Sequence, residues 1–218
     1  MRLDPVLEAH LPSTHSSILD LGCGRGELLN ELYNRGYKLL AGVDKHIHNP
    51  HAIACGVVEK DARDYLWNND IPYACVIMWD VIEHFKKSEI GPLLSLTRRN
   101  LLIGGTLILH LPNAEGLFGS RIYHSDLTHR WAYTPQLITS LLEKAGFVDI
   151  QCHECRPIVH GPVSFLRYVA WLGISWIGRM VLAVETGQYN GVVSQNFIVT
   201  AKKGGATCST SFSARYLV

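Results

Sequence analysis

The amino-acid sequence indicates an α/β protein with a doubly wound, mostly parallel sheet, and three features support this. Short apolar runs alternate with segments of helical periodicity, and such alternation places crossover helices on both faces of a parallel sheet. A glycine-rich loop follows the first apolar run. Acidic residues end several runs, at the edge where open parallel sheets bind their ligands. We therefore expect a ligand-binding domain of doubly wound topology.

The expected strands are short runs of apolar residues bounded by glycine, acidic residues or polar turns. The first is broken by Gly22, and the second ends at Asp44. The third run is the weakest, and Gly104 and Gly105 are expected to turn the chain before the fifth. In order, we expect strands over residues 17–21, 39–44, 55–59, 74–79, 106–111, 147–153 and 196–201.

Three helices are expected between these strands. Residues 27–35 place Leu28, Leu29 and Leu32 on one face, and Gly36 is a suitable stop. A second helix is expected somewhere within residues 89–102. The third begins at Thr134 and Pro135, since threonine is a good N-cap and proline suits the first helical position.

Length and composition bound the domain organisation. The chain has 218 residues, of which 47% are hydrophobic and 18% charged, and its net charge is +1. This suits one globular domain, expected over residues 1–203, followed by a disordered tail over 204–218. Because nucleic-acid binding relies on a surplus of basic residues, a nucleic-acid partner is not favoured.

The loop after the first strand contains Gly22, Gly24 and Gly26. Glycines without a Cβ allow backbone to approach a ligand closely. In a dinucleotide-binding GxGxxG motif counted from Gly22, the third glycine would fall at Glu27, and an acid is unfavourable beside a pyrophosphate. No GK[ST] motif is present either. The loop therefore suits a nucleoside ligand that lacks phosphate and carries positive charge.

Four acids at expected strand ends support a cationic ligand. Asp44 lies about twenty residues beyond the loop, where an acid can accept hydrogen bonds from ribose hydroxyls. Asp61, with the backbone of Ala62, can reach an adenine edge. Asp20 and Asp80 end the first and fourth strands. Each acid alone could be a helix cap, but together they favour a binding site.

These segments resemble the motifs of class I S-adenosylmethionine-dependent methyltransferases. Residues 18–26 are similar to the first motif, 42–44 to the second, 60–62 to the adenine-contacting segment and 76–84 to the fourth-strand motif. The resemblance implies a Rossmann-like sheet of seven strands with an antiparallel last strand, and S-adenosyl-L-methionine as cofactor. It also implies the cofactor-binding residues: Asp20, Gly22, Gly24, Asp44, Asp61 and Ala62, with Met78 and Trp79 on the methionine side.

The methyl acceptor is expected between the loop after the fifth strand and an insert over residues 156–195. Residues 126–135 resemble a segment of ubiquinone-pathway and sugar O-methyltransferases. A hydroxyl acceptor gains from a base near neutral pKa. We expect His129 to be that base, with Asp126 orienting it or His124 acting instead. The acceptor is a small molecule, a saccharide or a lipid-linked compound; the alternatives are a quinol or aromatic acceptor, or a nucleic acid or protein.

The insert contains a strongly apolar stretch over residues 163–184. Arg167 and Arg179 lie within it and would be costly in lipid, and Gly173 and Gly178 interrupt it. We expect one or two helices that lie at a bilayer interface, pack over the core or form a homodimer surface, rather than a membrane span. Because residues 1–11 contain no apolar signal segment, the expected location is cytoplasmic with possible membrane association.

A metal site is not expected from the sequence. Cys152 and Cys155 form a CxxC pattern, but they lie in an expected strand, where residues three apart point to opposite faces. No second CxxC is present. The cysteines are therefore expected to be reduced thiols.

Overall fold

A computed structural model describes residues 3–47, 56–187, 189 and 191–205. Its centre is a seven-stranded sheet with the order β3-β2-β1-β4-β5-β7-β6. The strands β1 to β5 are parallel, and β7 runs antiparallel between β5 and β6. This confirms the expected sheet and its antiparallel last strand. The strands are β1 (Ile18–Leu21), β2 (Leu40–Asp44), β3 (Val57–Glu59), β4 (Tyr73–Trp79), β5 (Leu101–Pro112), β6 (Phe147–Glu154) and β7 (Asn196–Lys203).

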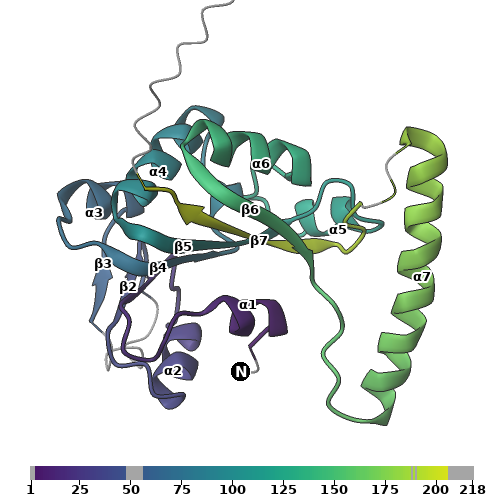
Figure 1. Cartoon of the computed structure of the whole chain (residues 1–218), viewed down its shortest axis with the longest axis horizontal. Coiled ribbons are helices and arrows are strands. Elements are labelled where there is room, and N and C mark those ends of the chain that lie inside the picture. Colours follow the sequence, from purple (N-terminus) through teal and green to yellow (C-terminus); the bar gives the residue numbers. More distant parts are fainter. Residues whose placement is uncertain (1–2, 48–55, 188, 190, 206–218) are drawn as a thin grey trace, which may run out of the picture.

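Helices cover both faces of the sheet (Figure 1). The helices α1 (Pro5–His10) and α2 (Glu27–Asn34) lie on one face. The other face carries α3 (Ala62–Asn68), α4 (Lys87–Arg99) and α6 (Pro135–Lys144). A 3-10 turn, η2 (Ile82–His84), follows β4, and the short helix α5 (Gly119–Tyr123) lies in the loop after β5.

Successive side chains along a strand point to opposite faces of the sheet, and a hydrophobic core forms on each face. In β4, Val76 packs in the layer under α4 and α6, whereas Ile77 packs in the layer with α1 and α2. Both side chains have no exposed surface. A near-continuous apolar strand is the pattern of a parallel sheet that is covered on both sides. The packing of both layers therefore sets the strand register, and the register places the ends of β1, β2 and β4 side by side.

Several elements differ from expectation. The strand β5 begins at Leu101 rather than residue 106, and the Gly104–Gly105 pair lies within it. The pairing with β4 shifts register there, with residues 102–105 opposite Ala74 alone, and Gly104 has a φ of 76°, so the glycines turn the chain locally without ending the strand. The helices α1, α3 and α5 were not expected from the sequence. They span only 6, 7 and 5 residues, too few for a clear helical period.

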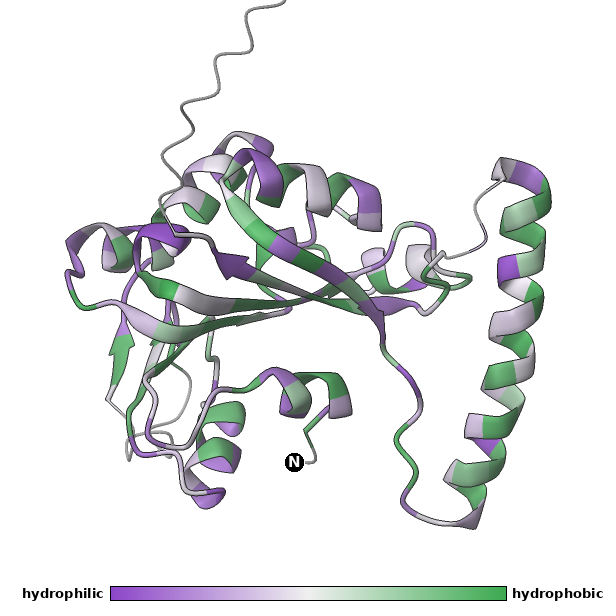
Figure 2. Cartoon of the chain, in the orientation of Figure 1, coloured by the Kyte–Doolittle hydropathy of each residue, from purple (hydrophilic) through white to green (hydrophobic). Residues whose placement is uncertain are grey.

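The insert forms one continuous helix, α7 (Pro162–Thr186), of 25 residues. It stands beside the domain, past the end of β6 (Figure 1), and apolar residues occur along its whole length (Figure 2), many of them exposed. Gly173 and Gly178 do not interrupt it. By length and composition alone, α7 is the one helix among the described residues that could cross a membrane, and 11% of its apolar window is buried. The expected disorder of the tail beyond residue 205 lies outside the described residues.

Candidate functional site

The glycine loop is held against the carboxyl ends of β1 and β2. The amide nitrogen of Gly22 donates to the carbonyl of Val43 at 2.6 Å. The amide of Gly24 donates to a carboxylate oxygen of Asp44 at 2.8 Å, and the other oxygen accepts from the amide of His46 at 2.9 Å. Asp44 therefore orders the loop as well as standing at the position expected to contact a ribose.

Gly22 allows the loop to approach the end of β4. Its φ is +80°, a conformation that other residues rarely adopt. A Cβ at this position would lie 2.4 Å from Cγ2 of Val81, which follows β4. The glycine is thus required both by the backbone conformation and by the space available between the loop and Val81.

Asp20 is a buried acid beneath this loop. It is 2% exposed, and its Oδ1 atom has no hydrogen-bond partner. Burial, together with repulsion from Asp44, raises the pKa of Asp20 to about 7. An unpartnered buried carboxyl beside a glycine cradle fits a ligand that brings positive charge and hydrogen-bond donors, as the sulfonium cofactor does.

Asp61 and Ala62 lie where β3 leads into α3. The carboxylate of Asp61 accepts from the amide of Arg63 at 2.9 Å, so it caps α3, and Ala62 is the first helical residue. Asp61 is half-buried, and its carboxylate also accepts from the Nε atom of Arg63 at 3.3 Å. It serves as a cap and is still partly accessible to a ligand.

The two residues at the end of β4 point in opposite directions. The side chain of Met78, which the sequence analysis expected on the methionine side of the cofactor, is fully buried in the core. Trp79 is half-buried and stacks on His110 of β5, with ring centroids 4.2 Å apart and planes 3° apart. The ring of His110 also contacts the carboxylate of Asp80 at 2.6 Å. The sequence places His110 at the end of the fifth strand, among the residues available to the acceptor, but only strand pairing places it beside Trp79.

The three candidate catalytic residues lie in the loop after α5. His124 is the C-cap of α5 and is exposed. The carboxylate of Asp126 is engaged by Thr128: its Oδ1 accepts hydrogen bonds from the amide and the hydroxyl of Thr128, both at 2.7 Å. These bonds lower the pKa of Asp126. The link between Asp126 and His129 runs through the backbone, where the amide of His129 donates to the carbonyl oxygen of Asp126 at 3.3 Å. The Nδ1 atom of His129 instead lies 3.2 Å from the carbonyl oxygens of Ile122 and Tyr123.

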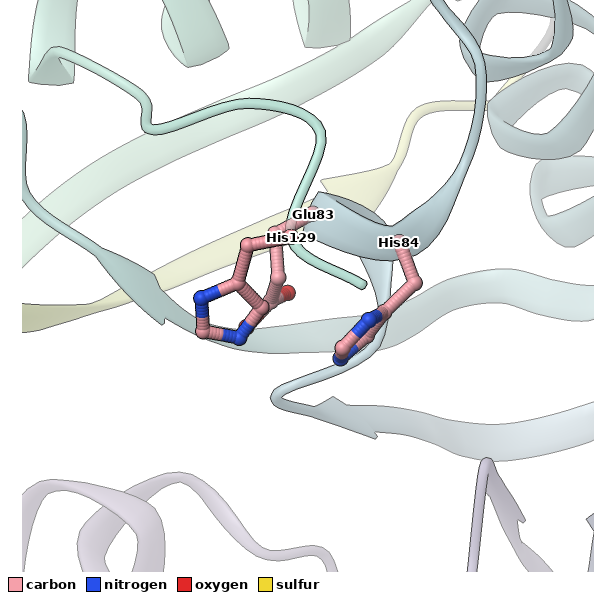
Figure 3. Close-up of side chains that lie close together, drawn as sticks. All are labelled: Glu83, His84 and His129. Atoms are coloured by element: carbon pink, nitrogen blue, oxygen red, sulfur yellow. The ribbon is translucent and has the colours of Figure 1, made fainter. Parts of the chain in front are cut away.

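His129 meets two residues that the sequence analysis left without a role. Glu83 and His84 belong to η2, directly after β4, and each of the three side chains offers a ligand atom within 4.8 Å of the others. They point toward one another across the gap between η2 and the loop (Figure 3). Both residues lie within the fourth-strand motif, so their position next to a strand end could have marked them as candidates. Their contact with His129 could not be foreseen, because His129 lies 45 positions beyond His84.

The insert reaches the same edge of the sheet from the side. Arg179 of α7 contacts the carboxylate of Glu154, at the end of β6, with a separation of 2.5 Å. The same carboxylate accepts from the amide of Val193 at 3.0 Å. Gly178 lies against Val193 and Leu117, the latter in the loop before α5. These contacts attach α7 beside the acceptor loop.

Comparisons with known proteins agree with this geometry. A family model described as a methyltransferase domain matches residues 3–152. A search of the curated proteins found no significant match. Among solved structures, a SAM-dependent methyltransferase from Archaeoglobus fulgidus is 23% identical, with a TM-score of 0.62 and coverage of 87% of this chain and 86% of that one.

Two further structures have the same fold. An S-adenosylmethionine-dependent methyltransferase from Mesorhizobium loti is 15% identical, with a TM-score of 0.61 and coverage of 91% of this chain and 96% of that one. A 1,6-didemethyltoxoflavin-N1-methyltransferase from Burkholderia thailandensis, solved with S-adenosylhomocysteine, is 17% identical, with a TM-score of 0.57 and coverage of 92% and 76%. At these identities the likeness concerns the fold.

Proposed function

Because the chain belongs to the methyltransferase-domain family and is an S-adenosylmethionine-dependent enzyme, we propose that it methylates a hydroxyl oxygen of a small molecule. The acceptor is a saccharide or a lipid-linked compound. The observation that carries this proposal is the pair of imidazoles, His84 and His129, at the edge of the cofactor-binding loop. Their unprotonated nitrogens can act on a hydroxyl group, which reacts poorly until its proton is removed or its oxygen is polarised.

The cofactor half of the site is built from the loop and the acids beside it. We propose that Gly22 and Gly24 cradle the cofactor through backbone contacts, while Asp44 binds the ribose and Asp61 and Ala62 bind the adenine. Asp20 holds the positively charged amino-acid end, and Trp79 lines it. When bound, S-adenosylmethionine supplies a methyl group on a cationic sulfur, which an acceptor oxygen displaces in line. The residues of the chain must then align the acceptor and exclude water.

On the acceptor side, we assign His129 as the residue that removes the proton of the acceptor hydroxyl group. Its Nδ1 atom faces two carbonyl oxygens, which only accept hydrogen bonds, so Nδ1 carries the proton and Nε2 has a free lone pair. Asp126 acts on this site through Thr128 and not through His129 itself. His124 is exposed and lies outside the cluster, so it is the weaker candidate.

An amine acceptor is the second candidate reaction, since one structural neighbour is an N1-methyltransferase. The end of β4, where Trp79-Asp80-Val81-Ile82 stands, lacks the N/D-PPY type of tetrapeptide suited to amino groups of bases. A quinol or aromatic acceptor would need an apolar pocket. Trp131 is 40% exposed and available for one, but Tyr133 is 1% exposed and belongs to the core.

The test is a measurement of S-adenosylhomocysteine formation with separate pools of saccharides, lipid-linked saccharides, quinols, amines, RNA and protein. We expect turnover with a hydroxyl-bearing saccharide pool and the methyl group on oxygen in the product. A His129→Ala protein is expected to lose at least about 100-fold in turnover, the smallest effect typical of a lost acid–base residue. Methylation confined to amine, RNA or protein pools would refute the proposal.

We further propose that α7 docks on an anionic lipid surface, which suits a lipid-linked acceptor. The small or polar residues Ser164, Ser175 and Gly178 are the buried ones, so they mark the side that faces the domain. Leu166, Ile177 and Val184 lie on the opposite side at helical spacing and are 67%, 57% and 85% exposed. Of the two charged residues between Pro162 and Val184, Arg179 is paired with Glu154, whereas Arg167 is exposed and can complement an anionic headgroup.

Vesicle sedimentation tests this surface. The wild-type protein is expected to pellet with anionic vesicles at low salt, and a Leu166→Ser/Ile177→Ser/Val184→Ser protein is expected to remain in the supernatant. The control is Ile103→Ser, which removes an equally exposed apolar side chain, 74% exposed, from β5. A protein that stays in the supernatant but forms a concentration-dependent dimer through the same three residues would assign the surface to a second copy of the chain.

A further inference from the structure

Hydrogen bonds to the backbone carbonyls of η2 join the segment that carries Glu83 and His84 to the loop that carries His129. The amide of Arg130 donates to the carbonyl of Glu83 at 2.8 Å. The Nε atom of Arg130 donates to the carbonyl of His84 at 3.1 Å, and the hydroxyl of Tyr133 donates to the carbonyl of Ile82 at 3.3 Å. The three side chains are therefore brought together by built contacts between η2 and the loop, and not by chance proximity on a surface.

In both histidines the Nδ1 atom has a hydrogen-bond partner outside the cluster, whereas the Nε2 atom has none among the described residues. The Nδ1 atom of His84 lies 2.9 Å from the hydroxyl oxygen of Thr128. Since that hydroxyl donates its own proton to Asp126, it must accept from His84, so Nδ1 of His84 carries the proton. His129 is held in the same tautomer by two carbonyl oxygens. Such second contacts, to a carbonyl or through a hydroxyl to a carboxylate, are typical of histidines that bind metal through Nε2.

Glu83 supplies the independent sign of a ligand. Its side chain is fully buried, and neither carboxylate oxygen has a hydrogen-bond partner among the residues that the structure describes. Burial raises the pKa of Glu83 to about 8, and Asp80 and Asp126 add to the effect through repulsion. A buried carboxylate without a partner is strongly unfavourable. Either it holds a proton, or a cation between it and the two imidazoles satisfies it.

We propose that Glu83, His84 and His129 bind one divalent transition-metal ion, of the type represented by zinc, cobalt or manganese. Two imidazoles and one carboxylate suit these ions better than calcium or magnesium, which prefer oxygen ligands. In a tetrahedral site with bonds of about 2.0–2.2 Å, ligand atoms lie about 3.3–3.6 Å apart. The present separations, of up to 4.8 Å, would close slightly around the ion.

Three protein ligands leave a coordination position open, as in catalytic zinc sites. We assign that position to the acceptor oxygen, which rests on the proposed function above. A bound cation polarises a coordinated hydroxyl group, lowers its pKa and fixes its position. His129 would then act on the acceptor through the ion. The metal would perform the activation for which a general base is otherwise needed.

Metal binding can be measured without turnover. The purified protein, stripped with a chelator, is titrated with Co²⁺ while the visible absorption is recorded, and with Zn²⁺ by calorimetry. We expect one equivalent of tightly bound ion. His84→Ala and His129→Ala are each expected to weaken binding at least about 100-fold, and Glu83→Gln at least about tenfold. Thr128→Val, which removes the hydroxyl behind His84, is expected to weaken it about tenfold.

The matched control is His124→Ala, since His124 lies in the same loop but outside the cluster, and it should bind the ion as the wild type does. Equal binding by all variants, or no bound equivalent in the wild type, would overturn the proposal. Glu83 would then be a buried protonated acid. Calorimetry with S-adenosylhomocysteine separates the two proposals. Cofactor binding without metal binding rejects the metal site alone, whereas metal binding without methylation of any hydroxyl acceptor rejects the proposed function.

Discussion

A Gly22→Ala protein is expected to lose about 2–5 kcal/mol of unfolding free energy and to lose detectable cofactor binding. Two costs add. An alanine at a φ of +80° costs about 1–2 kcal/mol, and the contact with Val81 adds about 1–3 kcal/mol of overpacking. Because the strained loop moves away from the end of β4, the cradle is lost as well. Urea denaturation measures the first effect and calorimetry with S-adenosylhomocysteine the second.

Gly24→Ala is the matched control for stability. Its φ is also positive, +51°, but nothing lies within 4 Å of an added Cβ. We expect it to lose only about 1–2 kcal/mol, the cost of the backbone conformation. A Gly22→Ala/Val81→Ala protein should recover the part of the loss that is due to the clash. If Gly22→Ala and Gly24→Ala are equally stable, the close packing of the loop against Val81 is wrong.

The affinity for S-adenosylmethionine is expected to fall about tenfold or more when the pH is lowered from about 7.5 to about 5.5. In the free protein, burial and the repulsion of Asp44 raise the pKa of Asp20 to about 7. A cationic ligand next to Asp20 stabilises its carboxylate, so binding returns the pKa toward the ordinary value of 3.8. Binding therefore releases a proton, and an acidic solution opposes it.

The raised pKa of Asp20 also makes the free energy of unfolding depend on pH. Below pH about 4 Asp20 is protonated in both folded and unfolded chains. As the pH rises toward 7, the unfolded chain ionises first, so the free protein loses stability over this range. Asp20→Asn should abolish this part of the pH dependence of both stability and affinity. Calorimetry over the pH range checks it, and an unchanged pH profile in Asp20→Asn would assign the titration to another group.

The sheet and the cofactor half of the site could be predicted from sequence because they depend on local patterns. Buried strands read as apolar runs, and a glycine loop followed by acids at strand ends is contiguous with those strands. Gly22, Gly24 and Asp44 accordingly lie together in the structure. Because side chains alternate along a strand, Met78 faces one side of the sheet and its neighbour faces the other. The sequence does not say which side is buried in the core, since that depends on the neighbouring strand.

The acceptor half depended on contacts between distant parts of the chain. Asp126 was expected to orient His129, yet its carboxylate is used by Thr128, which supports His84 instead. The short helices were also missed, since one or two turns show no period and owe their stability to packing. For α7 the sequence determined an apolar composition, whereas only the structure showed a single uninterrupted helix with small residues toward the domain.

The amino-acid sequence by itself determined the α/β class, the strand order along the chain and the glycine loop that we propose binds the cofactor, because hydrophobic period, glycine and strand-end acids are properties of neighbouring residues. Only the tertiary structure decided that Glu83 and His84 meet His129, and that Glu83 is buried without a partner. The physical reason is that η2 and the loop after α5 are joined by one backbone hydrogen bond and by bonds from the side chains of Arg130 and Tyr133 to carbonyls of η2, which leave no periodic trace in the sequence.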